Sequence, residues 1–223
     1  MDKQLLEGTV NAIVAPGKGI LAADESTPTM GGRLSQVGAE NTENNRRDFR
    51  ELLFTTENME ENISGVILFD ETLRQQSAGE GMLTDNLIKK GVIPGIKVDK
   101  GAKNLANTSN EKITEGLDGL RDRLNEYFEL GARFDKWRAV ITIGEGIPTD
   151  YCIDANAHAL ARYSALSQEA GLVPIVEPEV LMTGNHSIET CYEVTKKTLN
   201  STFAELKSQG VHLPGILLKP NMV

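Results

Sequence analysis

The sequence predicts an α/β fold, namely a TIM (β/α)8 barrel of which about six of the eight βα units are present. Short apolar segments alternate with longer amphipathic ones, and the short segments recur roughly every 40 residues. Nearly every short segment also carries charge at or near its carboxyl end. Charges that converge from the carboxyl ends of many parallel strands are typical of the mouth of such a barrel.

Six segments are predicted to be strands, because each is short, rich in β-branched residues and bounded by Gly or Pro. Strands buried on both faces are expected to be apolar throughout, so charges near their ends indicate a site. The six segments are Gly19–Asp24, Gly65–Asp70, Ile93–Asp99, Phe134–Ile143, Val173–Val180 and Gly215–Pro220.

Four longer segments between these strands are predicted to be helices. In each one, apolar residues recur at helical spacing, and a Gly follows close behind the last three. The stretch Gly101–Asn110 is predicted to be a polar loop. The predicted helices are Asn44–Thr55, with Thr42 or Asn44 as its cap, Leu117–Leu130, Ile153–Ala170 and Ile188–Ser208.

Residues 1–223 are expected to form a single barrel domain. A doubly wound sheet is the alternative, but its crevice lies at only one or two strand ends, whereas the charges here are spread over six. Barrels of this type need eight strands and typically about 250 residues. We therefore expect the barrel to be incomplete on its C-terminal side.

Composition and charge exclude several classes of protein. The net charge is −9, from 23 basic and 32 acidic residues, so neither nucleic acid nor a membrane surface is an expected partner. Cys152 and Cys191 lie far apart and form no CxxC motif, which argues against a disulfide framework or a structural zinc site. The N-terminus lacks the pattern of a signal peptide, and a cytoplasmic location is expected.

Lys219 is the candidate nucleophile. It lies in an otherwise apolar strand, where loss of water and repulsion from Lys136 would both favour the neutral amine. A neutral amine attacks a carbonyl to form a Schiff base. The alternative is a solvated or ion-paired lysine at a strand end.

Glu177 and Glu179 flank Pro178 and project from one face of a strand. A carboxylic acid there could supply the proton that Schiff-base formation needs when water leaves. Two alternatives remain open: salt bridges with Lys136 or Arg138, and a Mg²⁺ site that also uses Asp70.

Further polar residues are candidates for contacts with substrate. Asp24 ends the first strand and could remove a hydroxyl proton from a bound sugar, although a helix cap is an equal alternative. Trp137 alternates with its charged neighbours and is expected to point into the helix layer. The cations suited to an anionic substrate are Arg33, Arg46, Lys97 and Arg138.

Seven segments spread over the chain, in order and correctly separated, closely resemble class I fructose-bisphosphate aldolases. They are APGKGILAADES (Ala15–Ser26), ENTENNRRDFR (Glu40–Arg50), GVILFDETL (Gly65–Leu73), GIKVDKG (Gly95–Gly101), KWRAVITIG (Lys136–Gly144), ARYSALSQEAGLVPIVEPEVL (Ala161–Leu181) and GILLKPNMV (Gly215–Val223).

The resemblance implies reversible cleavage of fructose 1,6-bisphosphate to dihydroxyacetone phosphate and glyceraldehyde 3-phosphate in glycolysis and gluconeogenesis. It implies no metal or other cofactor, and usually a homotetramer. It also implies a role for each candidate: Lys219 as the Schiff-base nucleophile, Glu177 in proton transfer, Glu179 in its support, Asp24 at the C4 hydroxyl, Lys136 in charge stabilisation, and Arg33, Arg46, Lys97 and Arg138 as contacts to substrate. A non-catalytic phosphate-binding scaffold and a metal-dependent lyase remain as alternatives.

Overall fold

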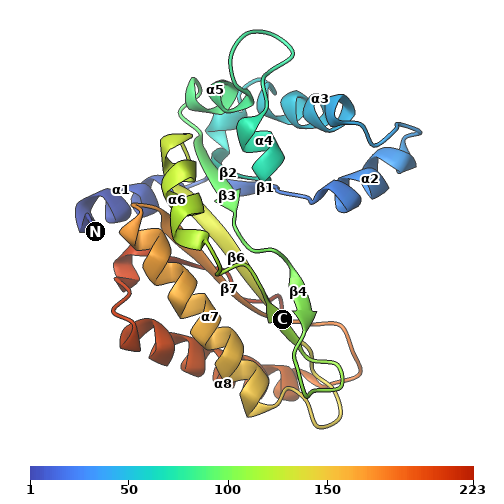
Figure 1. Cartoon of the computed structure of the whole chain (residues 1–223), viewed down its shortest axis with the longest axis vertical. Coiled ribbons are helices and arrows are strands. Elements are labelled where there is room, and N and C mark those ends of the chain that lie inside the picture. The colour runs from blue at the N-terminus through green and yellow to red at the C-terminus, as the bar shows by residue number, and fades with distance from the viewer.

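The computed structural model describes all 223 residues and is built around one parallel sheet (Figure 1). Its six strands follow the order β1-β2-β3-β6-β7-β8, and all neighbours are parallel. All six predicted strands are therefore confirmed. Their bounds are β1 (Gly19–Ala23), β2 (Ile63–Leu68), β3 (Ile93–Lys97), β6 (Phe134–Ile141), β7 (Val173–Val180) and β8 (Leu217–Leu218).

Four of the helices are the predicted ones, and the side chain of Thr42 caps the first of them by accepting a hydrogen bond from the backbone N–H of Asn45. No helix combines the length and the apolar composition of a bilayer span. The confirmed helices are α3 (Glu43–Phe54), α6 (Leu120–Glu129), α7 (Asp150–Glu169) and α8 (Ile188–Ser208), and those not predicted are α1 (Lys3–Ile13), α2 (Thr27–Gln36), α4 (Asp70–Arg74), α5 (Leu83–Ile88), and the 3-10 turns η1 (Met59–Glu61) and η2 (Leu213–Gly215).

The expected polar loop Gly101–Asn110 is wrong in part. Strand β4 (Ala102–Asn104) lies within it and pairs antiparallel with β5 (Lys112–Thr114) as a separate two-stranded ribbon. All of β4 is exposed, so its sequence carries no buried alternation that would have revealed a strand.

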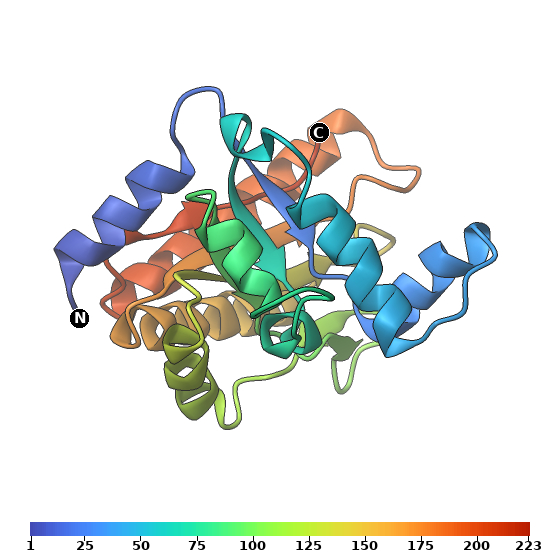
Figure 2. The same ribbon diagram turned by 90° about the horizontal axis from the view of Figure 1, so that it is seen from above.

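The main sheet is curled, with helices around its outside (Figure 2). Lys136 on β6 and Asp24, the residue after β1, form an ion pair of 2.5 Å although two strands separate β6 from β1. This contact is possible only across the hollow of a strongly curved sheet. The fold is therefore a partial TIM barrel of the predicted α/β class.

Alternation along the strands divides the inner face of this sheet into two zones. One layer of inward-facing residues is apolar, and it packs with Leu6 and Ile13 of α1 in a cluster that also holds Ile67, Phe134, Val173 and Ile175. Two residues further along the same face, strands carry charge instead, as in Lys136 after Phe134. The apolar zone thus forms a floor, and the charged zone above it forms the mouth.

The outer face of the sheet packs against the helices in a cluster of 25 buried residues. Trp137 belongs to this cluster, is fully buried, and stacks on Tyr163 of α7 with ring centroids 5.6 Å apart. The prediction that Trp137 points into the helix layer is confirmed.

Candidate active site

Lys219 and Glu177 meet at the mouth. Strand β8 pairs with β7, and the backbone N–H of Lys219 extends this pairing by donating to the carbonyl of Val176 at 2.9 Å. The ladder therefore places Lys219 beside Glu177, and the ammonium donates a short hydrogen bond to the Glu177 Oε1. The Glu177 side chain is only 2% exposed, and its Oε2 is buried without a partner.

Lys219 differs from expectation in one respect. Its side chain is 54% exposed, so the expectation of a desolvated amine is wrong for this structure. The reason is that β8 has only two residues and forms an edge of the sheet. Its acidic neighbour Glu177, in contrast, lies beside it at the mouth, as predicted from the sequence.

Arg138 faces both glutamates from the neighbouring strand. Its Nε donates a short hydrogen bond to Glu179 and lies 3.9 Å from Glu177 Oε1. Burial lowers the pKa of Arg138, but the hydrogen bond and the charges of the two glutamates outweigh it, so the pKa is raised overall. The salt-bridge alternative for the glutamates is thus realised, and it joins them to the mouth.

Asp24 and Lys136 form a second buried ion pair across the hollow. Each side chain is 11% exposed, and 2.5 Å separates Lys136 Nζ from Asp24 Oδ2. Asp24 lies just before α2, but Ser26 is the residue at the cap position. Asp24 is therefore available as a base facing the mouth.

A cavity of about 250 Å³ adjoins these pairs. Lys97 and Arg138 provide positive charge on its wall, and Ser26 and Thr29 provide hydroxyls that lie 3.0 Å from each other. Asp24, Glu25 and Asp99 also line it, and Asp99 lies 3.4 Å from Lys97. Cations with hydroxyl donors suit phosphate oxygens.

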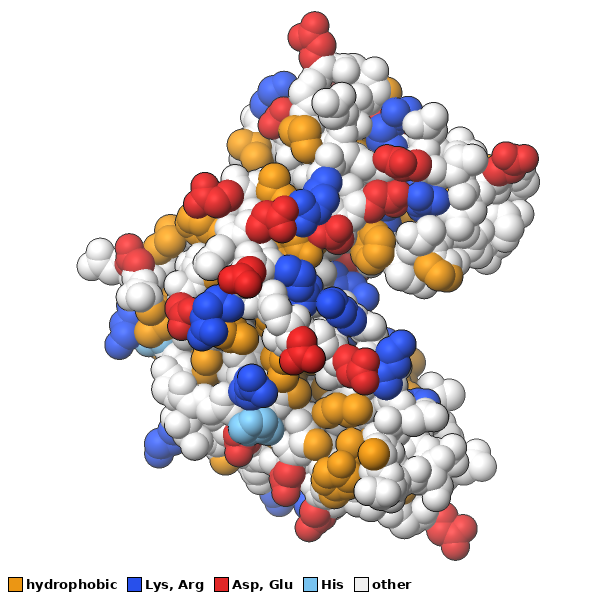
Figure 3. All heavy atoms as spheres, viewed as in Figure 1, with side chains coloured by type: hydrophobic (Ala, Val, Ile, Leu, Met, Phe, Trp, Pro, Cys, Tyr) orange, Lys and Arg blue, Asp and Glu red, His pale blue; other side chains and the backbone are white.

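The two hydroxyls were not singled out from the sequence. Their signal is the Ser-Thr-Pro-Thr run Ser26–Thr29, with Pro28 in the first turn of α2, which marks a helix start next to a strand end. A wider cavity of about 820 Å³ shares Ser26, Lys97 and Asp99 with this one and continues toward α6. Figure 3 shows Lys and Arg side chains gathered with Asp and Glu in the middle of this face.

Arg33 and Arg46 do not line the 250 Å³ cavity, although Glu25, the partner of Arg33, does. Arg33 pairs with Glu25 at 2.7 Å, and Arg46 binds Glu71 at 2.5 Å and also donates to Asn41. Neither arginine lines this cavity or the wider one. Their role as contacts to substrate stays a prediction.

The Mg²⁺ alternative gains no geometric support. Asp70 accepts hydrogen bonds from Arg74 and from the hydroxyl of Tyr127, and it lines the wider cavity rather than lying with Glu177 and Glu179. No group of three or more His, Cys, Asp or Glu side chains in the structure is arranged to hold a metal ion.

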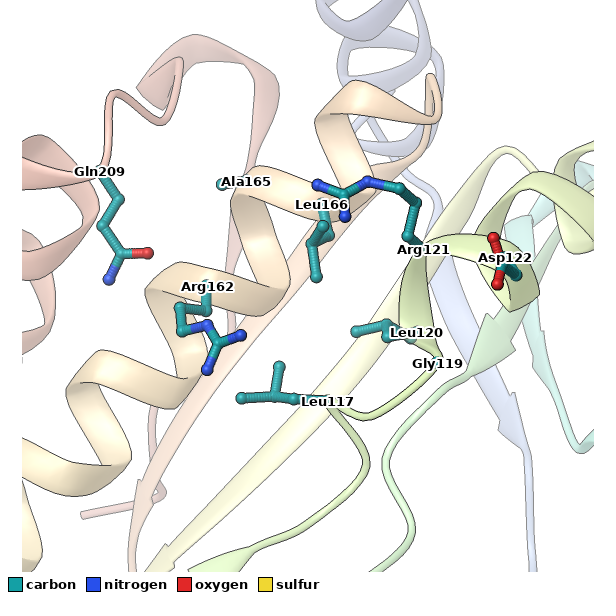
Figure 4. A pocket seen from close by; sticks show the side chains of 9 residues that line it. All are labelled: Leu117, Gly119, Leu120, Arg121, Asp122, Arg162, Ala165, Leu166 and Gln209. Carbon is teal, nitrogen blue, oxygen red and sulfur yellow. The ribbon is translucent and has the colours of Figure 1, made fainter.

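Another cavity, of about 410 Å³, lies on the outer surface between α6, α7 and the end of α8 (Figure 4). Leu117 and Leu166 line it together with Arg121 and Arg162. It contains none of the candidate residues, so it is separate from the mouth.

The chain is similar to known proteins over its whole length. The family model described as "Glycolytic: Fructose-bisphosphate aldolase class-I" matches residues 5–223. A protein of Xanthomonas campestris, described as a probable fructose-bisphosphate aldolase class 1, is 60% identical over 223 residues, which are 100% of this chain and 67% of the relative.

Two further relatives come from eukaryotes. "Fructose-bisphosphate aldolase 4, cytosolic" of Arabidopsis thaliana is 54% identical over 95% of this chain and 54% of its own length. The solved structure of fructose-bisphosphate aldolase from Plasmodium falciparum, in complex with TRAP and a small-molecule inhibitor, superposes with a TM-score of 0.97 at 50% identity. This match covers 99% of the present chain and 64% of that one.

Proposed function

Since this chain belongs to the class-I fructose-bisphosphate aldolase family, a family of carbon–carbon lyases, we propose that its mouth performs the Schiff-base reaction on fructose 1,6-bisphosphate. The observation that carries the proposal is the short contact between Lys219 and the buried Glu177. Proton transfer between two groups requires this kind of reach.

The first half of the reaction forms the Schiff base. Glu177 takes a proton from the Lys219 ammonium, and the neutral amine attacks the ketone carbon of the sugar. The protonated Glu177 then returns a proton to the hydroxyl of the carbinolamine, which leaves as water. Glu179 and Arg138 hold Glu177 in place, since Arg138 contacts both glutamates.

The second half breaks the C3–C4 bond. Asp24 removes the proton of the C4 hydroxyl, the aldehyde forms, and the bonding electrons pass into the protonated imine to give an enamine. Lys136 stabilises the negative charge near Asp24, which it contacts. The enamine is then protonated at C3, and water releases dihydroxyacetone phosphate from Lys219.

The 250 Å³ cavity is the proposed position of one phosphate. Lys97 and Arg138 supply charge there, and the hydroxyls of Ser26 and Thr29 supply hydrogen bonds. Arg33 and Arg46 are proposed as outer contacts that approach substrate only after leaving their glutamates. The partners are thus sugar bisphosphate and triose phosphates.

We extend the proposal to the whole protein on the strength of its relatives. Residues 1–223 form one barrel domain of a protein that assembles as a homotetramer and works in the cytoplasm without a metal or other cofactor. Two Arabidopsis relatives are named as cytosolic, which supports the location. Sedimentation of the purified protein measures the assembly.

Reductive trapping tests the proposal. The chain is incubated with dihydroxyacetone phosphate and sodium borohydride, with and without EDTA, and its intact mass is measured. We expect a covalent gain of one reduced triose phosphate that EDTA leaves unchanged and that Lys219→Met abolishes. Binding of the sugar phosphate without any adduct would instead support the scaffold alternative, and loss of the adduct in EDTA would support the metal-dependent one.

A further inference from the structure

Asp135 is a fully buried carboxyl that takes no part in the proposed reaction. It precedes Lys136 on β6, so it faces away from the mouth toward α7. It forms no ion pair, and its neighbours on the adjacent strands are Ile96 and Pro174. A buried carboxylate without a cation is costly, so the ionised form of Asp135 is disfavoured in this place.

The oxygen atoms around Asp135 outnumber the protons that could join them. The Tyr163 hydroxyl lies 2.9 Å from Asp135 Oδ1, 3.2 Å from the Asp135 carbonyl and 3.1 Å from the Ile175 carbonyl. The Ser167 hydroxyl lies 2.6 Å from Asp135 Oδ2 and 3.0 Å from the Tyr163 carbonyl. Two hydroxyl protons thus serve five close oxygen–oxygen contacts.

A proton on Asp135 relieves this shortage. The carboxylic acid then donates to the Tyr163 oxygen, and the Tyr163 hydroxyl is free to donate to the Ile175 carbonyl. Ser167 continues to donate, either to the carboxyl or to the carbonyl of Tyr163. With three protons instead of two, the Asp135 carboxyl and the Ile175 carbonyl no longer compete for the single proton of Tyr163.

The charges near this cluster act in the same direction. Burial raises the pKa of Asp135 to about 7, against the hydrogen bonds from Ser167 and Tyr163, which lower it. Burial and the charge of Asp135 raise the pKa of Tyr163, and Asp99 and Glu177 raise it further. No charged side chain acts on the pKa of Asp135 itself, and the charges that act on Tyr163, from Asp135, Asp99 and Glu177, are all acidic.

The Tyr163 hydroxyl also connects the strands that carry the mouth. Asp135 is adjacent to Lys136, and Ile175 lies two residues before Glu177 on the same face of β7. The Tyr163 ring is held in turn by its stacking on Trp137. This single side chain therefore fixes α7 against β6 and β7 directly below the catalytic candidates.

We propose that Asp135 takes up a proton when the chain folds and serves as a positioning residue, holding Tyr163 so that its hydroxyl supports the β7 backbone that presents Glu177. When Asp135 loses this proton, the one proton of Tyr163 must serve both the carboxylate and the Ile175 carbonyl, and the link to β7 weakens. Whether Asp135 is protonated does not depend on the proposed function. The positioning role of Asp135, in contrast, rests on the proposed function.

Infrared spectroscopy tests the proton. Chain labelled with ¹³C-carboxyl aspartate is compared with the Asp135→Asn variant as the pH is raised from 6 to 9. We expect a carbonyl band of a protonated carboxylic acid at pH 6 that the variant lacks, with loss of the band at a midpoint near pH 7, the pKa of Asp135. Absence of this band from the wild-type chain at pH 6 would overturn the proposal.

The rate of reductive trapping at Lys219 tests positioning. Asparagine donates from its amide at every pH, so the ratio of the Asp135→Asn rate to the wild-type rate should be near one at pH 6 and rise above pH 7. Asp135→Leu, which has no donor, should be slower than Asp135→Asn throughout, with circular dichroism as the check on folding. Tyr163→Phe, which keeps the ring but not the hydroxyl, should also be slow.

Two outcomes contradict positioning. One is a pH-independent ratio between Asp135→Asn and wild type, and the other is a Tyr163→Phe chain that traps as fast as wild type. A wild-type chain that forms no adduct overturns the proposed function and the positioning role together, and the infrared measurement then still decides the proton.

Discussion

Two lysines at the mouth each lie against a carboxylate presented by a different strand, whereas Lys97 pairs with Asp99 just beyond its own strand. Lys219 contacts Glu177, and Lys136 contacts Asp24. Each pair is close enough for direct proton transfer, and in the proposed reaction a proton moves from Lys219 to Glu177 before the amine attacks.

Loss of the Glu177 acid should slow imine formation. The Glu177→Gln variant keeps the shape of the side chain but cannot transfer a proton, so we expect trapping at Lys219 to fall by about 10²–10⁴-fold, the usual contribution of general acid–base catalysis. The rate of adduct formation is measured by quenching the borohydride trapping reaction at successive times. Glu169→Gln, in the exposed ion pair with Arg121, is the control and should trap normally; equal rates for the two variants would contradict the assignment.

Asp24 should act only after the imine has formed. In Asp24→Asn, we expect trapping with dihydroxyacetone phosphate to persist within about tenfold, because this ligand needs no C4 deprotonation, whereas cleavage of fructose 1,6-bisphosphate should fall by about 10² or more. A coupled assay for triose phosphate measures cleavage. A variant that loses trapping and cleavage equally would show that Asp24 acts through the fold or through Lys136 instead.

Asp135 should make stability depend on pH. Its pKa is about 7 in the folded chain against 3.8 for an ordinary Asp, so the folded state holds an extra proton between these values. The stability contribution is complete below pH 4 and is lost as pH rises to 7, with a slope of up to about 1.4 kcal/mol per pH unit. Urea unfolding of wild type and Asp135→Asn should therefore diverge over this range, in favour of Asp135→Asn, and run parallel above it.

At the scale of elements, the alternation of side chains on parallel strands builds both floor and mouth. Phe134 and Lys136 share one face of β6. Phe134 packs in the apolar floor, and Lys136 reaches the mouth. The Phe134 ring fits because Gly95 and Gly65 lie opposite, where a Cβ would stand 2.3 Å and 2.9 Å from ring atoms. Two glycines thus set how closely the strands approach.

Gly95→Ala should therefore destabilise the chain. Overpacking of this kind typically costs about 1–3 kcal/mol or more, because the Phe134 ring must shift within a closed floor. Denaturant unfolding measures the loss. The matched control is Gly8→Ala on α1, which has nothing within 4 Å of the new Cβ and should gain about 0.5–1 kcal/mol through helix propensity. A neutral Gly95→Ala would contradict the packing account.

The regular elements were predictable because they repeat a strong local pattern. Buried strands such as Val173–Val180 and the long helix Ile188–Ser208 have the bounds predicted from sequence. Helix α2 was missed because it contains Pro28 and a Gly pair, and strand β4 was missed because it is exposed.

The site was predictable in composition but only partly in geometry. Charges on one face of each strand end indicated Lys219, Glu177 and Lys136. That Arg46 is held by Glu71, or that Ser26 faces Lys97, depends on contacts between residues distant in sequence, and no local pattern encodes such contacts.

At the scale of the whole molecule, the curled sheet has two edges. Strand β1 pairs only with β2, and β8 pairs only with β7. Edge strands with free N–H and C=O groups are templates for pairing with another chain.

We therefore expect the 223-residue chain to associate as its concentration rises. Light scattering should show a mean mass that grows with concentration, and Leu218→Lys on edge strand β8 should reduce this growth because charge blocks edge pairing. Leu52→Lys, at an exposed leucine of α3, is the control and should leave it unchanged. A mass independent of concentration would contradict the expectation.

Peptide mapping of the borohydride-reduced adduct is the most direct test of the mechanism. The account predicts that the triose phosphate is attached to the single peptide that contains Lys219, with Lys136 and Lys97 unmodified. Attachment to either of these two lysines, or no attachment at any lysine, would contradict it.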